Sequence, residues 1–255
     1  MAQASHIVTE MGFTAAVDGP VAAGRAEIFP EVCVPGSATV RTSMLATWLD
    51  VITGWLAVGW MAPRIPLTLD LEVQVIEPIA EGDVVLAEAG VVKAGRTVLV
   101  TEARFRLQGS TSPAAVGYAS FAASPNPEHR FPPGFAPPSR TEQANRMPVP
   151  LAERARCRIV EPGTAEVPRQ PRGLNSSGGI QGGLVALAAE EAASSLSAEP
   201  VFLRSLGLRY LRPFAVGPAR AVAERHGDLA LVRLTDAGAD KLGATATARL
   251  APVPS

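Results

Sequence analysis

Two glycine pairs stand directly before a stretch with strong helix composition, in the segment NSSGGIQGGLVALAAEE (Asn175–Glu191). Gly182 and Gly183 fall in the first turn of the predicted helix, where glycine is costly relative to alanine. Free N–H groups at a helix N-terminus can hold negative charge, and glycine lets the backbone approach a reacting carbonyl. We therefore predict an oxyanion site in which Gly182 presents its N–H and Gly183 keeps the approach open. Asn175 or Gln181 could add a side-chain donor or hold the attacking water.

The carboxylate that such a site needs has two candidates. Glu190 follows Gly182 by eight helical residues, a rise of roughly 12 Å at 1.5 Å per residue, so the two cannot easily serve one carbonyl. Asp50 is the only charged residue in the run from Met44 to Ala62, which is predicted to be a helix that is apolar on most sides. We expect Asp50, from the other half of the chain, to act as general base or as direct nucleophile, with a pKa raised by burial.

Both halves of the chain show the same order of elements. A strand-like start leads into a helix, expected at about 43–62 in the first half and about 182–196 in the second, and about four strand-like segments follow. The strand-like segments span residues 25–32, 66–78, 83–93, 96–107, 114–123, 153–160, 202–213, 219–227, 229–238 and 244–251. A proline-rich extended linker is predicted between the halves. The predicted organisation is an N-terminal unit at 1–124, the linker at 125–150 and a C-terminal unit at 151–255.

The two halves are also related in sequence. LTLDLEVQVIEPIAEGD matches FLRSLGLRYLRPFAVGP with Pro78 opposite Pro213, so the repeat is about 135–140 residues long. One helix followed by about four antiparallel strands indicates a sheet wrapped around a single helix in each half.

These residues resemble a known family. The layout is similar to a double hotdog fold, and the loop is similar to that of acyl-CoA thioesterases of the phenylacetate-degradation type. That family carries an Asn, then His-Gly-Gly six residues later, and an acid nine residues after the His. Here Asn175 is followed by Gln181-Gly-Gly and then by Glu190. The family also has a Ser or Thr at the start of the next strand, ten residues before a proline, and Thr68 matches that position.

The sequence departs from the family pattern in both halves. Gln181 replaces the usual His. In the first half, Arg41, Thr42 and Ser43 stand where His-Gly-Gly would be, and Pro35 stands where the Asn would be. The resemblance implies an α+β fold of two tandem hotdog units, each an antiparallel sheet around one central helix, packed as a pseudo-dimer with its sites between the halves.

Two sites are possible between the units. The first combines a glycine loop with an acid and a hydroxyl, and its members are Asn175, Gln181, Gly182, Asp50 and Thr68. The second lacks the glycines, the Asn and the hydroxyl, and its members would be Arg41, Thr42, Ser43, Glu190 and Leu203. We expect one working site per chain, in which Thr68 orients Asp50 or its water. Gly183 and Glu190 are expected to contact the substrate.

Some of these residues also have plainer interpretations. Thr42 or Ser43 would by default be the N-cap of the first helix. Glu190 beside Glu191 is more often an exposed helical pair, and the glycine loop could be a plain turn.

The resemblance implies a hydrolase that acts on acyl-CoA or acyl-carrier-protein thioesters. Lys93, Arg96 and Arg104 are available for the phosphates of such a carrier. Two alternatives stay open: a non-catalytic protein that binds acyl thioesters or polyketide- or steroid-like ligands, and an enoyl-thioester hydratase or dehydratase. Enzymes of the last kind use a His, and no histidine is expected near the glycine loop.

Composition narrows the range of partners. A formal net charge of −1 gives no electrostatic support for binding nucleic acid or an anionic membrane. No signal peptide, no apolar run of membrane-spanning length and no cofactor motif is evident, and Cys33 and Cys157 fit no metal or redox spacing. We expect a cytoplasmic protein with free thiols and no cofactor, which could assemble as a homo-oligomer.

Overall fold

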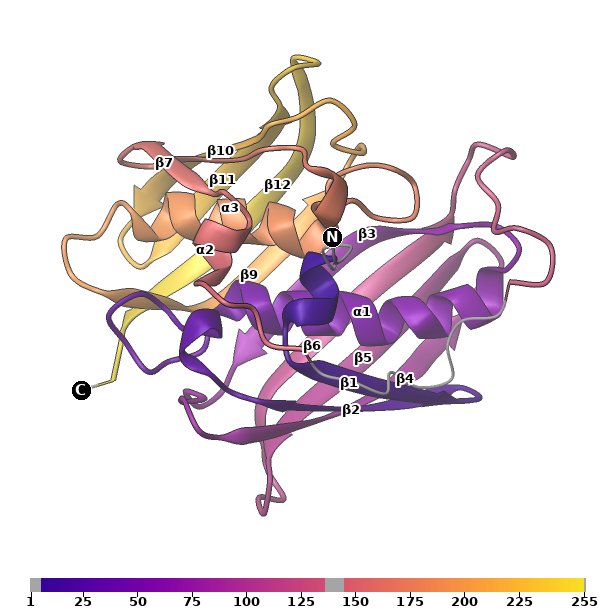
Figure 1. Cartoon of the computed structure of the whole chain (residues 1–255), viewed down its shortest axis with the longest axis horizontal. Helices are drawn as coiled ribbons and strands as arrows, with labels where there is room; N and C mark the ends of the chain where they lie inside the picture. Colours follow the sequence, from indigo (N-terminus) through magenta and orange to yellow (C-terminus); the bar gives the residue numbers. More distant parts are fainter. Residues whose placement is uncertain (1–5, 136–144, 255) are drawn as a thin grey trace.

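The computed structural model describes residues 6–135 and 145–254, and within them the chain forms one antiparallel sheet of twelve strands. The sheet curves around two central helices, α1 (Thr42–Met61) and α3 (Gly182–Ser194), which contact each other (Figure 1). The strand order is β1-β2-β4-β5-β6-β3-β9-β12-β11-β10-β8-β7. This is the predicted double hotdog fold, in which each unit wraps a sheet around one helix and the units pack as a pseudo-dimer.

The remaining elements divide between the two units. The strands of the first unit are β1 (Phe13–Asp18), β2 (Val21–Glu27), β3 (Pro66–Val75), β4 (Val84–Ala94), β5 (Val98–Leu107) and β6 (Pro113–Ala123). Those of the second unit are β7 (Arg158–Glu161), β8 (Thr164–Val167), β9 (Val201–Tyr210), β10 (Ala219–His226), β11 (Leu229–Asp236) and β12 (Lys241–Pro252). The short helical elements are η1 (Ile7–Glu10), η2 (Pro30–Val32), α2 (Leu151–Arg154) and η3 (Pro171–Gly173).

The two units are joined where β3 pairs with β9. Within this ladder Glu72 lies opposite Gly207, its own counterpart in the sequence repeat. A residue pairs with its own counterpart only where a two-fold axis passes, so the pseudo-symmetry axis crosses the sheet at this pair. Each helix N-terminus is thereby placed against the middle of the helix of the other unit.

The sequence located most elements but misplaced the start of each unit. Residues 25–32 do not form one strand: β2 ends at Glu27, and Pro30 begins the turn η2. Proline has no N–H for a sheet ladder, which favours this break. Strand β1 was not predicted. In the second unit, α2 and the β7–β8 hairpin replace the single strand expected at 153–160.

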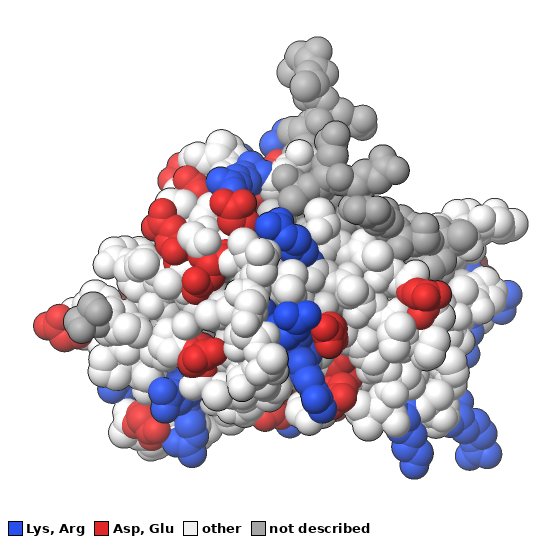
Figure 2. Space-filling view, turned by 90° about the horizontal axis from the view of Figure 1, so that it is seen from below, with Lys and Arg blue, Asp and Glu red and all other residues white. Residues whose placement is uncertain are grey.

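Helix α1 contradicts one expectation about apolar runs. By length and composition alone its twenty residues could cross a membrane, and 61% of its most apolar window is buried inside the fold. That burial explains the composition, because the helix is surrounded by the sheet and by α3. Figure 2 shows basic and acidic side chains interspersed on one face of the molecule, with much of that face uncharged.

The predicted unit boundaries stay a prediction, because residues 136–144 of the expected linker lie outside the described residues. The N-terminal segment before β1 also contacts the second unit. Glu10, in the N-terminal turn η1, pairs with Arg154 of α2 at 2.5 Å. His6 also bonds to the carbonyl of Leu174 at 2.8 Å, so the N-terminal segment packs on the loop before α3. This contact shows that the expectation of no histidine near the glycine loop was wrong, although His6 does not line the cavity described below.

Candidate active site

The N-terminus of α3 carries two free backbone donors. Within the part of the chain that the structure describes, the N–H groups of Gly182 and Gly183 make no hydrogen bond. Gln181 is the N-cap, and its Oε1 accepts from the N–H of Leu184 at 3.2 Å. Its Nε2 donates to Oδ2 of Asp50, on the other unit, at 3.1 Å. The Gln181 amide therefore links the start of α3 to the acid of α1.

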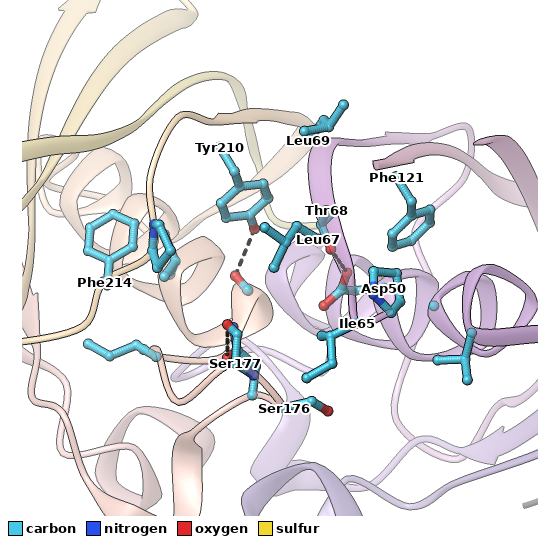
Figure 3. Close-up of a pocket in the computed structure, with 18 of the residues that line it drawn as sticks. Asp50, Ile65, Leu67, Thr68, Leu69, Phe121, Ser176, Ser177, Tyr210 and Phe214 are labelled. Atoms are coloured by element: carbon cyan, nitrogen blue, oxygen red, sulfur yellow. Dashed lines mark hydrogen bonds between the residues drawn. The ribbon is translucent and has the colours of Figure 1, made fainter. Parts of the chain in front are cut away.

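Asp50 is held by hydrogen bonds to both of its carboxylate oxygens. The hydroxyl of Thr68, at the start of β3, donates to Oδ1 at 2.8 Å, as Figure 3 shows. Gln181 occupies Oδ2. Burial raises the pKa of Asp50 to about 6, and the bond from Thr68 lowers it by a smaller amount. The predicted acid thus combines a fixed orientation with a pKa suited to taking a proton near neutral pH.

Tyr210 belongs to the same cluster and was missed in the sequence. Its hydroxyl donates to the carbonyl of Gly182 at 2.8 Å (Figure 3). Burial, and secondarily the negative charge of Asp50, raise the pKa of Tyr210 well above its ordinary value, so it stays a donor. The Gly182 carbonyl and the Gly183 N–H share one peptide plane, so this bond also fixes the direction of that N–H.

These groups meet at a cavity of about 290 Å³ between the two units. The wall includes Asp50, Thr68, Gly182 and Tyr210. Among the described residues the only charged side chains in the wall are Asp50 and Arg212. A largely apolar cavity with a few convergent polar groups is the usual form of a small-molecule site.

Asn175 lies in the cavity wall, as the predicted grouping requires, and its role as a side-chain donor stays a prediction. Its Oδ1 accepts from the N–H and hydroxyl of Ser177, at 3.0 and 2.8 Å, and from the N–H of Gly179 at 3.1 Å. These bonds close the loop before α3. The side-chain oxygen is therefore committed to loop geometry, and Asn175 shapes the mouth of the cavity.

Gly183 has a packing role that corrects the prediction of an open approach. A Cβ at this position would lie 2.0 Å from Oγ1 of Thr47 in α1. No side chain fits there, so Gly183 is what lets the N-terminal turn of α3 lie directly against α1. Gly182 differs, because a Cβ there would meet Asp50 Oδ2 and the Tyr210 hydroxyl at 3.2 Å, inside the polar cluster.

Glu190 lies at the pseudo-symmetric second site and does not line the cavity. It is 2% exposed, which corrects the expectation of a solvated pair with Glu191. Its Oε1 accepts from the N–H groups of Thr42 and Ser43 at 2.9 and 3.3 Å. Its Oε2 accepts from the Ser43 hydroxyl at 2.5 Å and from Nη1 of Arg41 at 3.3 Å. The proposed contact of Glu190 with substrate is therefore not supported by its position.

The second site is closed by its own side chains. Arg41, not Thr42 or Ser43, is the N-cap residue of α1, and its side chain pairs with Glu190 and also with Glu191 at 2.7 Å. The Thr42 hydroxyl donates to the carbonyl of Leu203, the counterpart of Thr68. With every acceptor of Glu190 bonded and no hydroxyl at Leu203, this site has no room for a reacting group.

The closed second site, with Glu190, can be compared with the open first site, with Asp50. Glu190 and Asp50 are counterparts, and so are the first two N–H groups of α1 and α3. In the closed site the carboxylate sits directly on those N–H groups. Aspartate is one methylene shorter, and in the open site the N–H groups of Gly182 and Gly183 are unbonded. The open site therefore offers two unbonded N–H groups and one carboxylate, and of the residues that carry them Asp50 and Gly182 line the cavity.

The remaining candidates lie away from the cavity. The cavity wall includes none of the basic residues considered for a carrier phosphate, namely Lys93, Arg96 and Arg104. No histidine among the described residues lines it either. This argues against histidine-dependent chemistry at this site.

Comparison with known proteins agrees with this architecture. A family model, the Thioesterase superfamily, matches residues 39–114, a segment that contains Asp50 and Thr68. No curated protein sequence matches the chain.

Several solved structures share the fold. The 12:0-ACP thioesterase from Umbellularia californica is 12% identical, with 93% of this chain and 99% of that chain covered and a TM-score of 0.65. An acyl-ACP thioesterase from Bacteroides thetaiotaomicron is 10% identical over 91% and 98% of the two chains, with a TM-score of 0.63. A Thermobifida fusca protein described as a candidate thioesterase II is 18% identical over 98% and 99%, with a TM-score of 0.58. At these identities the likeness establishes the fold.

Proposed function

We propose that this protein hydrolyses acyl thioesters at the single open site between its two units. The observation that carries the proposal is that Asp50 lies beside the start of α3, where two backbone N–H groups make no hydrogen bond. The pKa of Asp50 is raised to about 6, so it is a carboxylate at neutral pH and yet basic enough to take a proton. The N–H groups are suited to the negative oxygen that forms during acyl transfer.

In the proposed mechanism Asp50 acts on water. It removes a proton from a water molecule, whose oxygen attacks the thioester carbonyl carbon. The carbonyl oxygen becomes negative and accepts hydrogen bonds from the N–H groups of Gly182 and Gly183. The C–S bond then breaks, and the thiolate takes the proton from Asp50, leaving a carboxylic acid and a free thiol.

The two hydrogen bonds on Asp50 favour this role over direct nucleophilic attack. Thr68 and Gln181 each occupy one carboxylate oxygen, at 2.8 and 3.1 Å. These bonds hold the carboxylate in place, whereas an attacking oxygen would have to move to bonding distance of the carbonyl carbon. A general base needs only to reach a water at hydrogen-bond distance. Gln181 therefore orients the acid where the resembling family has a His.

The carrier of the acyl group is part of this proposal. Two of the structural neighbours are named as acyl-ACP thioesterases, which supports a thioester substrate. We propose acyl-CoA or acyl-carrier-protein thioesters, without bound metal or cofactor. A cytoplasmic location and assembly into a homo-oligomer stay predictions.

The test is release of free thiol from a panel of short, medium, long and aromatic acyl-CoAs and of acyl carrier proteins. Asp50→Asn, purified in the same way, serves as the blank for contaminating activity. Turnover by the wild type above this blank supports the proposal. Binding of the thioesters by folded wild-type protein, with no thiol released from any of them, would refute hydrolysis and favour the binding-protein alternative.

A further inference from the structure

Gly54 is an unusual residue for the middle of α1. Glycine is unfavourable in a helix interior, and the neighbouring positions in this helix carry Thr, Trp and Leu. Gly54 lines the cavity, and a Cβ built on it would meet no atom within 4 Å. The missing side chain thus leaves open space in the cavity wall.

That space lies on the same face of α1 as the acid. Asp50, Gly54 and Val58 all line the cavity, each four residues after the last. At 1.5 Å per residue, Gly54 is about 6 Å and Val58 about 12 Å along the helix from Asp50. The cavity therefore continues from the reacting groups for about two helical turns.

The walls of this part of the cavity are apolar. Trp55 lines it on α1, Ile65 and Leu67 line it near the start of β3, and Phe121 and Phe131 complete it. Figure 3 shows Ile65 and Leu67 beside Asp50, and Phe121 on the side of Asp50 away from Phe214. None of these residues carries a charge, so the space suits a hydrocarbon chain and no part of a phosphorylated carrier.

We propose that Gly54 holds open an acyl channel that selects medium-chain acyl groups, of about eight to ten carbons. An extended chain advances roughly 3.3–3.6 Å per residue of three bonds, or about 1.1–1.2 Å per bond. The stretch from Asp50 to Val58 therefore accommodates about ten bonds. This inference rests on the proposed function, because that function places the thioester at Asp50. The existence of the channel does not depend on it.

Two leucine substitutions in the same helix give a matched test. Gly54→Leu places a side chain in the channel, whereas Gly59→Leu places it on an exposed position of α1 that does not line the cavity. Thiol release is measured for straight-chain acyl-CoAs from C2 to C16 with wild type and both variants. Circular dichroism and thermal melting show that each variant is folded.

We expect wild-type kcat/KM to rise with chain length to C8–C10 and to fall beyond. Gly54→Leu is expected to lose at least about 100-fold on C8–C10, because several methylenes lose their burial, and to stay within about threefold on C2–C4. Gly59→Leu should keep the wild-type profile. The inference is overturned if Gly54→Leu keeps that profile, or if the wild type prefers C16.

A binding measurement separates this inference from the proposed function. Calorimetric titration of decanoyl-CoA into Asp50→Asn protein, with and without Gly54→Leu, reports the channel without any turnover. Tight binding that Gly54→Leu weakens at least about tenfold would support the channel. If the wild-type protein at the same time released no thiol from any thioester, the function would be refuted and the channel would stand. Equal binding by both proteins would refute the channel, whether or not the wild type hydrolyses thioesters.

Discussion

Asp50 and Glu190 occupy equivalent positions in the two units, and we predict opposite effects on stability when each is neutralised. Glu190 accepts hydrogen bonds from two backbone N–H groups, the Ser43 hydroxyl and Arg41, and it is 2% exposed. Removing one partner of a buried ion pair costs about 3–5 kcal/mol. Glu191 still pairs with Arg41 at 2.7 Å, so for Glu190→Gln we expect the lower end, about 3 kcal/mol.

The sign is reversed at Asp50, because burial opposes its charge. Its folded-state pKa of about 6 exceeds the ordinary value of 3.8, so the native state binds a proton more tightly than the unfolded state between these values. Wild-type stability from this group is therefore present below about pH 4 and is lost as pH rises through about 6. At about 1.4 kcal/mol per pKa unit the loss is at most about 3 kcal/mol. Because Asp50 also contacts the solvent of the cavity, we expect about 1–2 kcal/mol.

The assay is guanidinium unfolding of wild type, Asp50→Asn and Glu190→Gln at pH 5 and pH 8, together with thermal melting. For a chain of this length the expected loss in Glu190→Gln is a fall in Tm of about 6–12 °C. The free energy of unfolding of Asp50→Asn, relative to wild type, should rise between pH 5 and pH 8. A cost below about 1 kcal/mol for Glu190→Gln, or a relative stability of Asp50→Asn that does not rise with pH, would refute the assignment of a structural and a functional acid.

Three further results are expected. The wild-type hydrolysis rate should rise with pH and level off above an apparent pKa of about 6, because Asp50 must be deprotonated; a rate that falls over this range in a pH series would contradict its role as a base. Tyr210→Phe should lower kcat about 10-fold or more with little change in KM, because the Gly182 carbonyl loses its hydrogen bond and the peptide that carries an oxyanion donor is held less firmly. An effect confined to KM would indicate that Tyr210 contacts the substrate instead. Gly183→Ala should lower the free energy of unfolding by about 1–3 kcal/mol, because its methyl group clashes with Thr47. In a melting experiment, adding Thr47→Ala to the same chain should restore part of this loss. Additive effects of the two substitutions would contradict the contact.

The fold could be predicted because its signals are local and repeated. The strand periodicity, the two apolar helices and the repeat that places Pro78 opposite Pro213 all indicate two equivalent units. The position of the pseudo-two-fold axis was not predicted and follows from the pairing of β3 with β9 in the structure. The starts of the units were misplaced because β1 and the β7–β8 hairpin are short and weakly patterned.

Part of the predicted site could be found because its residues stand out from their neighbours in the sequence. Asp50 stood out as the one charge in an apolar helix, and Thr68 as a hydroxyl at a strand start, and the two are hydrogen-bonded. Gln181 lies within reach of Asp50, as the grouping required, although it holds the acid and does not face the cavity.

The missed features depend on partners distant in sequence. Tyr210 matches Val75 in the repeat and belongs to no motif, so nothing in the sequence marked it. The burial of Glu190 depends on Arg41, which lies 149 residues away. Gly183 was predicted to keep the approach to the reacting carbonyl open. Its packing role was missed because the side chain it makes room for, that of Thr47, belongs to the other unit. Local sequence indicates helix starts and acids, but pairing across the interface decides which acid is structural.

The central claim is that one carboxylate, that of Asp50, performs the chemistry while its counterpart Glu190 is structural. The most direct measurement is kcat/KM for the best thioester with wild type, Asp50→Asn and Glu190→Gln, at a temperature where all three are folded. We predict that Asp50→Asn loses about 100-fold or more and that Glu190→Gln stays within about threefold of wild type. An Asp50→Asn enzyme within tenfold of wild type, or a Glu190→Gln enzyme that is folded and inactive, would contradict the account.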